Sequence, residues 1–162
     1  MDYDDNFEKV DAGASLTYPV TMGEIKKGGF ICIDGRPCKV VEYSTAKTGK
    51  HGHAKASITA IDIFTKKKME DSQTTSHNVD VPNISRTEYS IMSIDNEGYC
   101  SLMNTNTNEL RSDIKLPDDT EDDLELATRI KNSVNDEKNQ NNKMVTVLSA
   151  MNIEKIIEFK ET

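Results

Sequence analysis

Short β-rich runs separated by turn signals constrain the fold of this chain more than any other feature. The runs Phe30–Ile33 and Pro37–Tyr43 are joined through Asp34-Gly35, a dipeptide typical of a tight two-residue hairpin. Three further runs of strand-like composition follow at residues 56–64, 67–73 and 78–81. No apolar pattern with the period of a helix crosses this part, so five or six short strands predict a small β-barrel.

The β pattern restarts after residues 80–83, where Pro82 restricts the residue before it to extended geometry. Further strands are predicted at residues 88–94, 99–103, 109–114 and 144–148. Thr120 and Asp123 match a capping box, and residues 124–131 continue it as a helix of about two or three turns. Strands interrupted by a helix before the last strand predict an OB-fold, which is a five-stranded barrel.

Two polar stretches and one apolar repeat complete the organisation. Residues 1–15 are acidic and carry few apolar side chains, so we expect a disordered tail. The segment Asn135–Asn142 is polar and rich in asparagine, which predicts a loop, and nothing in the sequence assigns a role to it. Three isoleucines at 153, 156 and 157 repeat at helical spacing after Asn152, a residue typical of N-caps, and predict a second short helix.

The charge distribution is uneven along the chain. The net charge is −8, but residues 17–83 carry +3 whereas residues 84–162 carry −7. Within residues 44–68 six lysines stand against the single acid Asp62. An acidic protein with one cationic segment can bind nucleic acid through one face. A solvated lysine-rich surface explains the same charges without a partner.

Membrane and secreted classes are disfavoured by the sequence. No apolar run approaches the roughly 18 residues of a membrane helix. Residues 1–5 are acidic, where a signal peptide is first basic and then apolar, so a cytoplasmic location without a membrane partner is expected. The cysteines are odd in number and lack metal-site spacing, which indicates reduced thiols at Cys32, Cys38 and Cys100.

The segment Ser44–Lys55 separates two of the predicted strands and is too long for an ordinary hairpin turn. It holds three lysines, two histidines and two glycines, and it contains no acid. Gly49 and Gly52 flank Lys50-His51, so the backbone there can adopt conformations closed to other residues. A segment of this composition does not contribute to a hydrophobic core. We expect it to expose one lysine at the tip of a loop that two glycines make flexible.

The loop sequence Thr48-Gly-Lys-His-Gly-His-Ala-Lys55 resembles the modification loop of the eukaryotic translation initiation factor 5A family, also described as an elongation factor. That family is similar to bacterial elongation factor P. Other segments resemble the family in the same order, from about Tyr18 to Met151, including Ile61-Asp-Ile-Phe-Thr65 and Val145-Thr-Val-Leu-Ser-Ala-Met151. Several separated segments are more specific than one short motif.

The resemblance implies a fold, a modification and a function. The implied architecture is mostly β: a tail over residues 1–15, an SH3-like barrel over residues 16–83 and an OB-fold over residues 84–162 with one or two short helices. In the family, deoxyhypusine synthase transfers an aminobutyl group from spermidine to one loop lysine and a hydroxylase adds oxygen, which makes hypusine. That lysine corresponds to Lys50. Loop support and RNA contact are expected from Lys47, Gly49, His51, Gly52, His53 and Lys55.

The partners implied by the family are the ribosome, through rRNA and ribosomal proteins, and peptidyl-tRNA at the neighbouring site. Modified Lys50 is expected to orient stalled peptidyl-tRNA, notably at proline-rich sequences, and to aid peptide release. No cofactor is expected besides the covalent modification. A general single-stranded RNA-binding OB module that needs no modification is the competing interpretation; its aromatic candidates are Tyr89 and Tyr99, although both residue types are more often found in cores.

Metal binding and catalysis fit the sequence less well. His51 and His53, with His77 elsewhere, can in principle hold zinc, but the lysines of the same loop oppose a cation, so no metal site is expected. The acids at residues 118–123 stand at a predicted helix start, where capping and the helix dipole explain them without acid–base catalysis.

Overall fold

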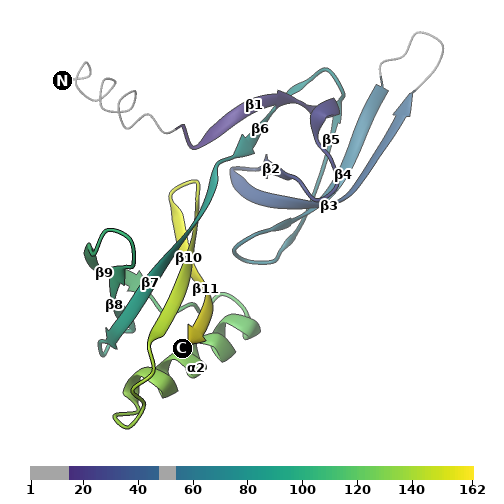
Figure 1. Ribbon diagram of the computed structural model, residues 1–162. Coiled ribbons are helices and arrows are strands. Elements are labelled where there is room, and N and C mark those ends of the chain that lie inside the picture. The colour runs from purple at the N-terminus through teal and green to yellow at the C-terminus, as the bar shows by residue number, and fades with distance from the viewer. Residues whose placement is uncertain (1–14, 48–53) are drawn as a thin grey trace. The chain divides into compact units, whose positions relative to one another are not determined.

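The structure is a computed structural model that describes residues 15–47 and 54–162 (Figure 1). The chain divides into two compact units. Unit 1 holds the described residues up to Ile63 together with Lys67–Asn83, and unit 2 holds Phe64–Lys66 together with Ile84–Thr162. The described residues are mostly strands, with one α-helix and one short 3-10 helix.

Unit 1 is a half-barrel: the strand pattern predicts a small barrel, and the family resemblance implies its SH3-like type. Its elements are β1 (Thr17–Thr21), the 3-10 helix η1 (Met22–Glu24), β2 (Phe30–Ile33), β3 (Arg36–Lys47), β4 (Ala54–Asp62), β5 (Lys68–Thr74) and β6 (Asn78–Pro82). Four antiparallel strands form one sheet in the order β2-β3-β4-β5, and β1 pairs with β6. Met22, Ile31, Val40 and Ala56 are almost fully buried in its core, at most 1% exposed. Along β4 every second residue from Ala56 to Asp62 is buried, which is the two-residue period of a strand with one face in the core.

The Asp34-Gly35 hairpin is confirmed: both residues have positive φ, 50° and 75°, as a two-residue turn between β2 and β3 requires. The sequence prediction missed η1. Its start is stabilised by the backbone N–H of Thr21, which donates to Glu24 Oε2 at 2.9 Å. A single turn of this length has too few residues for an apolar period to reveal it.

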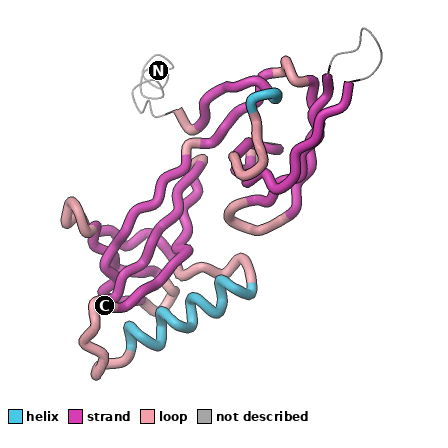
Figure 2. The backbone as a smooth tube through the Cα atoms, turned by 45° about the vertical axis from the view of Figure 1, so that its right-hand side comes forward, coloured by secondary structure: helices cyan, strands magenta, loops and turns pink. Residues whose placement is uncertain are grey.

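Unit 2 is the OB-fold, in which the order of five antiparallel strands is β11-β10-β7-β8-β9. Its elements are β7 (Ile84–Ile94), β8 (Tyr99–Asn104), β9 (Leu110–Lys115), α2 (Glu121–Asn135), β10 (Lys143–Ala150) and β11 (Ile153–Glu161). Helix α2 packs against β7 and β11 (Figures 1 and 2). Leu102, Ile130 and Ile156 are fully buried, at 0% exposed, which places the apolar stripe of α2 against the strands.

The outer strands of this sheet, β9 and β11, are joined by the side chain of Arg111. Its guanidinium donates to both carboxylate oxygens of Glu154 on β11, at 2.8 and 2.9 Å. The same group donates to the Tyr89 hydroxyl at 3.2 Å and lies 5.8 Å from the centre of that ring. The backbones of these two strands are not paired with each other in the sheet, so this bidentate side-chain contact is what links them.

The capping box at the start of α2 is confirmed. The backbone N–H of Asp123 donates to Thr120 Oγ1 at 3.0 Å, and the backbone N–H of Thr120 donates to Asp123 Oδ2 at 3.2 Å. The helix continues to Asn135, four residues beyond the predicted end at residue 131. Of the described helices, none is long and apolar enough to cross a membrane.

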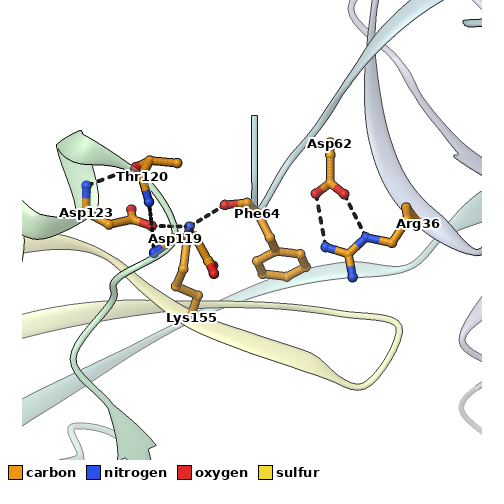
Figure 3. A network of polar contacts seen from close by, with 7 residues as sticks. All are labelled: Arg36, Asp62, Phe64, Asp119, Thr120, Asp123 and Lys155. Carbon is orange, nitrogen blue, oxygen red and sulfur yellow. Dashed lines mark hydrogen bonds and ion pairs between the residues drawn. The ribbon is translucent and has the colours of Figure 1, made fainter. Parts of the chain in front are cut away.

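A buried lysine, Lys155 on β11, supports this capping box (Figure 3). Its Nζ lies 2.7 Å from Asp123 Oδ2 and 3.4 Å from Asp119 Oδ2, and it also donates to the backbone carbonyl of Phe64. An ammonium has three donors, and each of them has an acceptor here. Phe64 belongs to the turn Phe64–Lys66 of unit 2, so this contact lies within that unit.

The predicted second helix is wrong, because residues 153–161 form strand β11. Asn152, which the helical spacing predicts to be an N-cap, instead forms a two-residue hairpin turn with Met151. The φ angles are 65° for Asn152 and 51° for Met151. The pairing of β10 with β11 shifts between Thr146 and Val147, and Ile157 is the extra residue on β11. A bulge of this kind interrupts the two-residue period of a strand, so the isoleucine spacing imitates a helix.

The three cysteines are thiols outside any disulfide, as predicted. Burial raises the pKa of Cys32, Cys38 and Cys100 to about 11 in each case, and a neighbouring carboxylate adds to the effect. A thiolate is the reactive form of cysteine, so these side chains are chemically quiet at neutral pH.

Candidate functional site

The candidate site is the β3–β4 hairpin, whose strands extend further than the sequence predicts. Pairing between the two strands continues to Lys47 opposite Ala54. The predicted loop Ser44–Lys55 is therefore too long: residues 44–47 and 54–55 belong to the strands. The cause is tertiary, since β5 pairs with β4 as far as Lys55 opposite Thr74 and holds the end of β4 in extended geometry.

Lys47 and Lys55 lie on opposite faces of the hairpin. Lys55 is opposite Ala46 and Lys47 is opposite Ala54, so the two lysines occupy adjacent rows of the sheet. Successive residues of a strand point to opposite faces, and directly opposed residues share a face. Both lysines are exposed. One positive charge thus flanks each side of residues 48–53 at the point where the strands end.

The central residues of the predicted site, Gly49, Lys50, His51, Gly52 and His53, lie outside the described residues. The third histidine, His77, is exposed between β5 and β6, where its backbone carbonyl accepts a hydrogen bond from Met22 N at 2.8 Å. Within residues 15–47 and 54–162 no three His, Cys, Asp or Glu side chains gather as a metal site would require.

The hairpin stands on a well-fixed base. At the end of β4 far from residues 48–53, Arg36 donates from Nε to Asp62 Oδ2 at 2.7 Å and from Nη2 to Oδ1 at 3.3 Å (Figure 3). The Asp62 side chain is only 3% exposed and the Arg36 side chain is 34% exposed, so the carboxylate of this bidentate pair is the part shielded from water. Nearer the tip, the Tyr43 hydroxyl donates to the carbonyl of Met22 at 3.3 Å. Fixed strands define where the ends of the 48–53 segment emerge.

A shallow groove of about 790 Å³ runs over the hairpin and β5. It is lined by Glu42, Tyr43, Ser44, Ser57, Ile58, Thr59, Glu70, Asp71 and Ser72. Ser57 and Ser72 hydroxyls are 3.1 Å apart across β4 and β5. Carboxylates therefore line this groove, whereas Lys47 and Lys55 concentrate the positive charge at the end of the hairpin next to residues 48–53.

Two family models cover this chain. Residues 15–77 match "Translation initiation factor 5A-like, N-terminal", and residues 83–160 match "Eukaryotic elongation factor 5A hypusine, DNA-binding OB fold". The chain belongs to the eukaryotic translation initiation factor 5A family. The protein is therefore a translation factor with the two-part architecture of that family, and the two matched ranges meet next to the division between units 1 and 2.

Relatives of the family align over nearly the whole chain. Translation initiation factor 5A-3 of Arabidopsis thaliana is 49% identical over 160 residues, covering 99% of this chain and 96% of the relative. Factor 5A-2 of Saccharomyces cerevisiae is 46% identical over the same length. A solved structure of a family protein from Naegleria fowleri has 51% identity and a TM-score of 0.82, covering 90% of this chain and 99% of its own. The corresponding structure from Methanococcus jannaschii has 29% identity and a TM-score of 0.66.

The OB-fold of this family member offers a poor platform for stacking RNA bases. Tyr89 is a core residue, 8% exposed, as the sequence reasoning favoured. Tyr99 is half-buried, with Lys115 Nζ 5.1 Å from its ring centre. The loop between β7 and β8 carries Asp95 and Glu97. OB-folds bind oligonucleotides with this loop and with the sheet beside it, and carboxylates there repel phosphates.

Two of the acids at residues 118–123, Asp119 and Asp123, make contacts that hold the start of α2. Asp123 is buried, caps α2 and pairs with Lys155. Asp119 is the second carboxylate near the same ammonium. Each of these interactions stabilises the start of the helix.

Proposed function

We propose that Lys50 is converted to hypusine and that the modified hairpin acts on the ribosome beside peptidyl-tRNA, promoting peptide-bond formation at stalled, proline-rich sequences and peptide release. Its modifying partners are deoxyhypusine synthase and deoxyhypusine hydroxylase. Its ribosomal partners are rRNA, ribosomal proteins and peptidyl-tRNA, in the cytoplasm. The protein supplies position and charge here, and the ribosome supplies the chemistry.

The observation that carries this proposal is the position of residues 48–53 between two fixed strand ends, with an exposed lysine on each face. The family model for residues 83–160 names hypusine, and the loop motif identifies Lys50 as the residue to modify. A primary amine is required, because its nitrogen forms the new C–N bond to the aminobutyl group while the rest of spermidine leaves as an amine, which an always protonated guanidinium cannot do. The product is longer and carries a second amine, which suits a narrow cavity lined by phosphates.

A mass measurement tests the modification directly. Peptide mapping of protein from its native source is expected to find one aminobutyl group and one oxygen on Lys50, and none on Lys47 or Lys55. An unmodified Lys50 in cells with active modifying enzymes would contradict the proposal. Recombinant protein made without these enzymes provides the unmodified standard.

A substitution tests whether the modification matters. Lys50→Arg is expected to fold normally and to fail in a reconstituted translation assay with a proline-run reporter. Arginine keeps the charge and binds phosphate well, so a site that needs charge alone tolerates it. Lys47→Arg is the matched control on the same hairpin and is expected to retain activity. Full activity of Lys50→Arg would mean that charge, and not hypusine, is what the ribosome requires.

The general RNA-binding OB module remains a second candidate, and charge decides against it as the main activity. Residues 84–162 carry −7, and Tyr99 lies beside a single lysine. In the full-length protein, Lys47→Gln with Lys55→Gln is expected to weaken binding to ribosomes. Each phosphate that a lysine no longer neutralises is expected to lower the salt slope by about 0.7–0.9. Lys115→Gln is the comparison in unit 2, and a larger effect there would favour the OB module.

A further inference from the structure

The asparagine-rich segment between α2 and β10 is an ordered strap, defined here as residues 136–142. Asn139 is its centre. The Asn139 side-chain N–H donates to Glu161 Oε1 at 2.6 Å and to Ser133 Oγ at 3.2 Å. Its side-chain oxygen accepts from the backbone N–H of Asn141 at 3.0 Å, and its carbonyl accepts from Lys143 Nζ at 3.0 Å. One residue thus contacts the end of α2, the end of β11 and the start of β10.

Glu161 fastens this strap to β11. Its Oε1 accepts a hydrogen bond from the Ser133 hydroxyl on α2 in addition to the one from Asn139. These donors lower the pKa of Glu161, the Ser133 hydroxyl most and Asn139 next, with Lys143 and Arg129 adding electrostatic support. Next to it, the backbone groups of Asn142 and Thr162 exchange two hydrogen bonds of 3.0 Å. The carboxylate is therefore ionised and held at neutral pH.

The end of α2 lacks the features that usually stop a helix. No basic residue lies in its last turn, and residues 136–142 contain no glycine. The residue at its C-cap is Asp136, with φ of −82°, and it is followed by Glu137, although the helix dipole disfavours negative charge at this end. The last turn therefore depends on contacts from outside the helix, and Ser133 makes such a contact.

We propose that residues 136–142 are a strap latched by Glu161, and that this latch, in place of a helix cap, holds the last turn of α2. Opening the latch releases the strap and the last turn together. The first turn stays in place, because Thr120, Asp123 and Lys155 hold it independently at the other end. The last turn of α2 therefore depends on the single carboxylate of Glu161, whereas the first turn does not.

Hydrogen exchange of the full-length protein tests the latch. In Glu161→Ala, amides of residues 133–143 are expected to exchange about ten-fold faster, because the variant removes two hydrogen bonds to a charged acceptor. Amides of residues 123–128 are expected to keep their wild-type rates. Trypsin provides a second measurement: cleavage after Lys138 and Lys143 is expected to accelerate in the same variant. Ser133→Ala removes one of the two donors and is expected to give a smaller change in the same segment.

Glu158→Gln is the matched control, since Glu158 is an exposed carboxylate on the same strand. It is expected to leave both measurements unchanged. The proposal is overturned if Glu161→Ala exchanges like Glu158→Gln over residues 133–143, or if exchange rises equally along the whole of α2. In the first case the strap needs no latch, and in the second the carboxylate stabilises unit 2 as a whole.

Discussion

Replacing Lys155 by methionine is the sharpest test of how unit 2 is held together. Methionine keeps the length and apolar stem of lysine but removes the ammonium, which leaves the buried carboxylate of Asp123 facing an apolar side chain. Removing one partner of a buried ion pair costs about 3–5 kcal/mol of stability. Two backbone N–H groups, those of Asp119 and Thr120, still donate to Asp123 at 3.1 and 3.2 Å. These bonds disperse part of its charge, so we expect the lower end, about 3 kcal/mol.

Urea denaturation followed by the helical circular dichroism signal measures this destabilisation, because the α-helix of the described chain lies in unit 2. Lys160→Met is the matched control. Lys160 lies on the same strand and pairs with Glu88 at 3.1 Å, but its side chain is 60% exposed. An exposed pair contributes about 0–1 kcal/mol, so the control is expected to shift stability by less than about 1 kcal/mol.

A double-mutant cycle with Asp123→Asn separates the ion pair from the cap. Asparagine keeps an oxygen for the backbone N–H groups but loses the charge. The double variant is expected to be more stable than the sum of the single losses, by about 1–3 kcal/mol, because no unpaired charge is left buried. If Lys155→Met costs no more than Lys160→Met, or if the two single losses simply add, the ion pair contributes nothing to the cap and the reasoning is refuted.

Three further results are expected. The cysteines, with pKa values of about 11, are expected to react with a disulfide reagent at pH 8 far more slowly in the native protein than in urea, and equal rates would contradict their burial. The guanidinium of Arg111 lowers the pKa of Asp113 in the folded state. The ionised carboxylate therefore stabilises the folded state fully above the pKa of an unfolded aspartate, about 4, and this stabilisation is lost as the pH falls through the lower folded pKa. Arg111→Gln is therefore expected to flatten the acid limb of a stability–pH curve, and an unchanged limb would refute the assignment. Asn152→Val is expected to lower stability by about 1–2 kcal/mol, because a β-branched residue disfavours φ of 65°, whereas Asn152→Gly is expected to be tolerated; equal thermal midpoints would contradict this.

Local signals in the sequence predicted most of the fold. Asp34-Gly35 produced its tight hairpin, and Thr120 with Asp123 produced the start of α2, because each depends on neighbours within a few residues. The strands of both units followed their composition and turns in the same way. The OB-fold could be proposed from element order, since the predicted helix before the last predicted strand is a property of the chain and not of its contacts.

The errors arose where a distant strand decides the outcome. The hairpin strands extend to Lys47 and Ala54 because β5 holds β4, and the sequence of the hairpin does not encode that support. The bulge at Ile157 depends on pairing with β10 and gives β11 the spacing of a helix. The only available signal was the content of β-branched isoleucine in residues 153–157, which favours a strand.

The structural role of Lys155 could not be found from the sequence. A lysine among isoleucines on a strand predicts a solvated charge, yet here it is buried with three acceptors from α2, its preceding loop and the turn at Phe64. Those acceptors are separated from it by 32 to 91 residues of chain. The motif around Lys50 is the opposite case, because it consists of consecutive residues and can be found without any distant contact. A function carried by a contiguous loop can therefore be inferred from the sequence before any contact that holds the fold together.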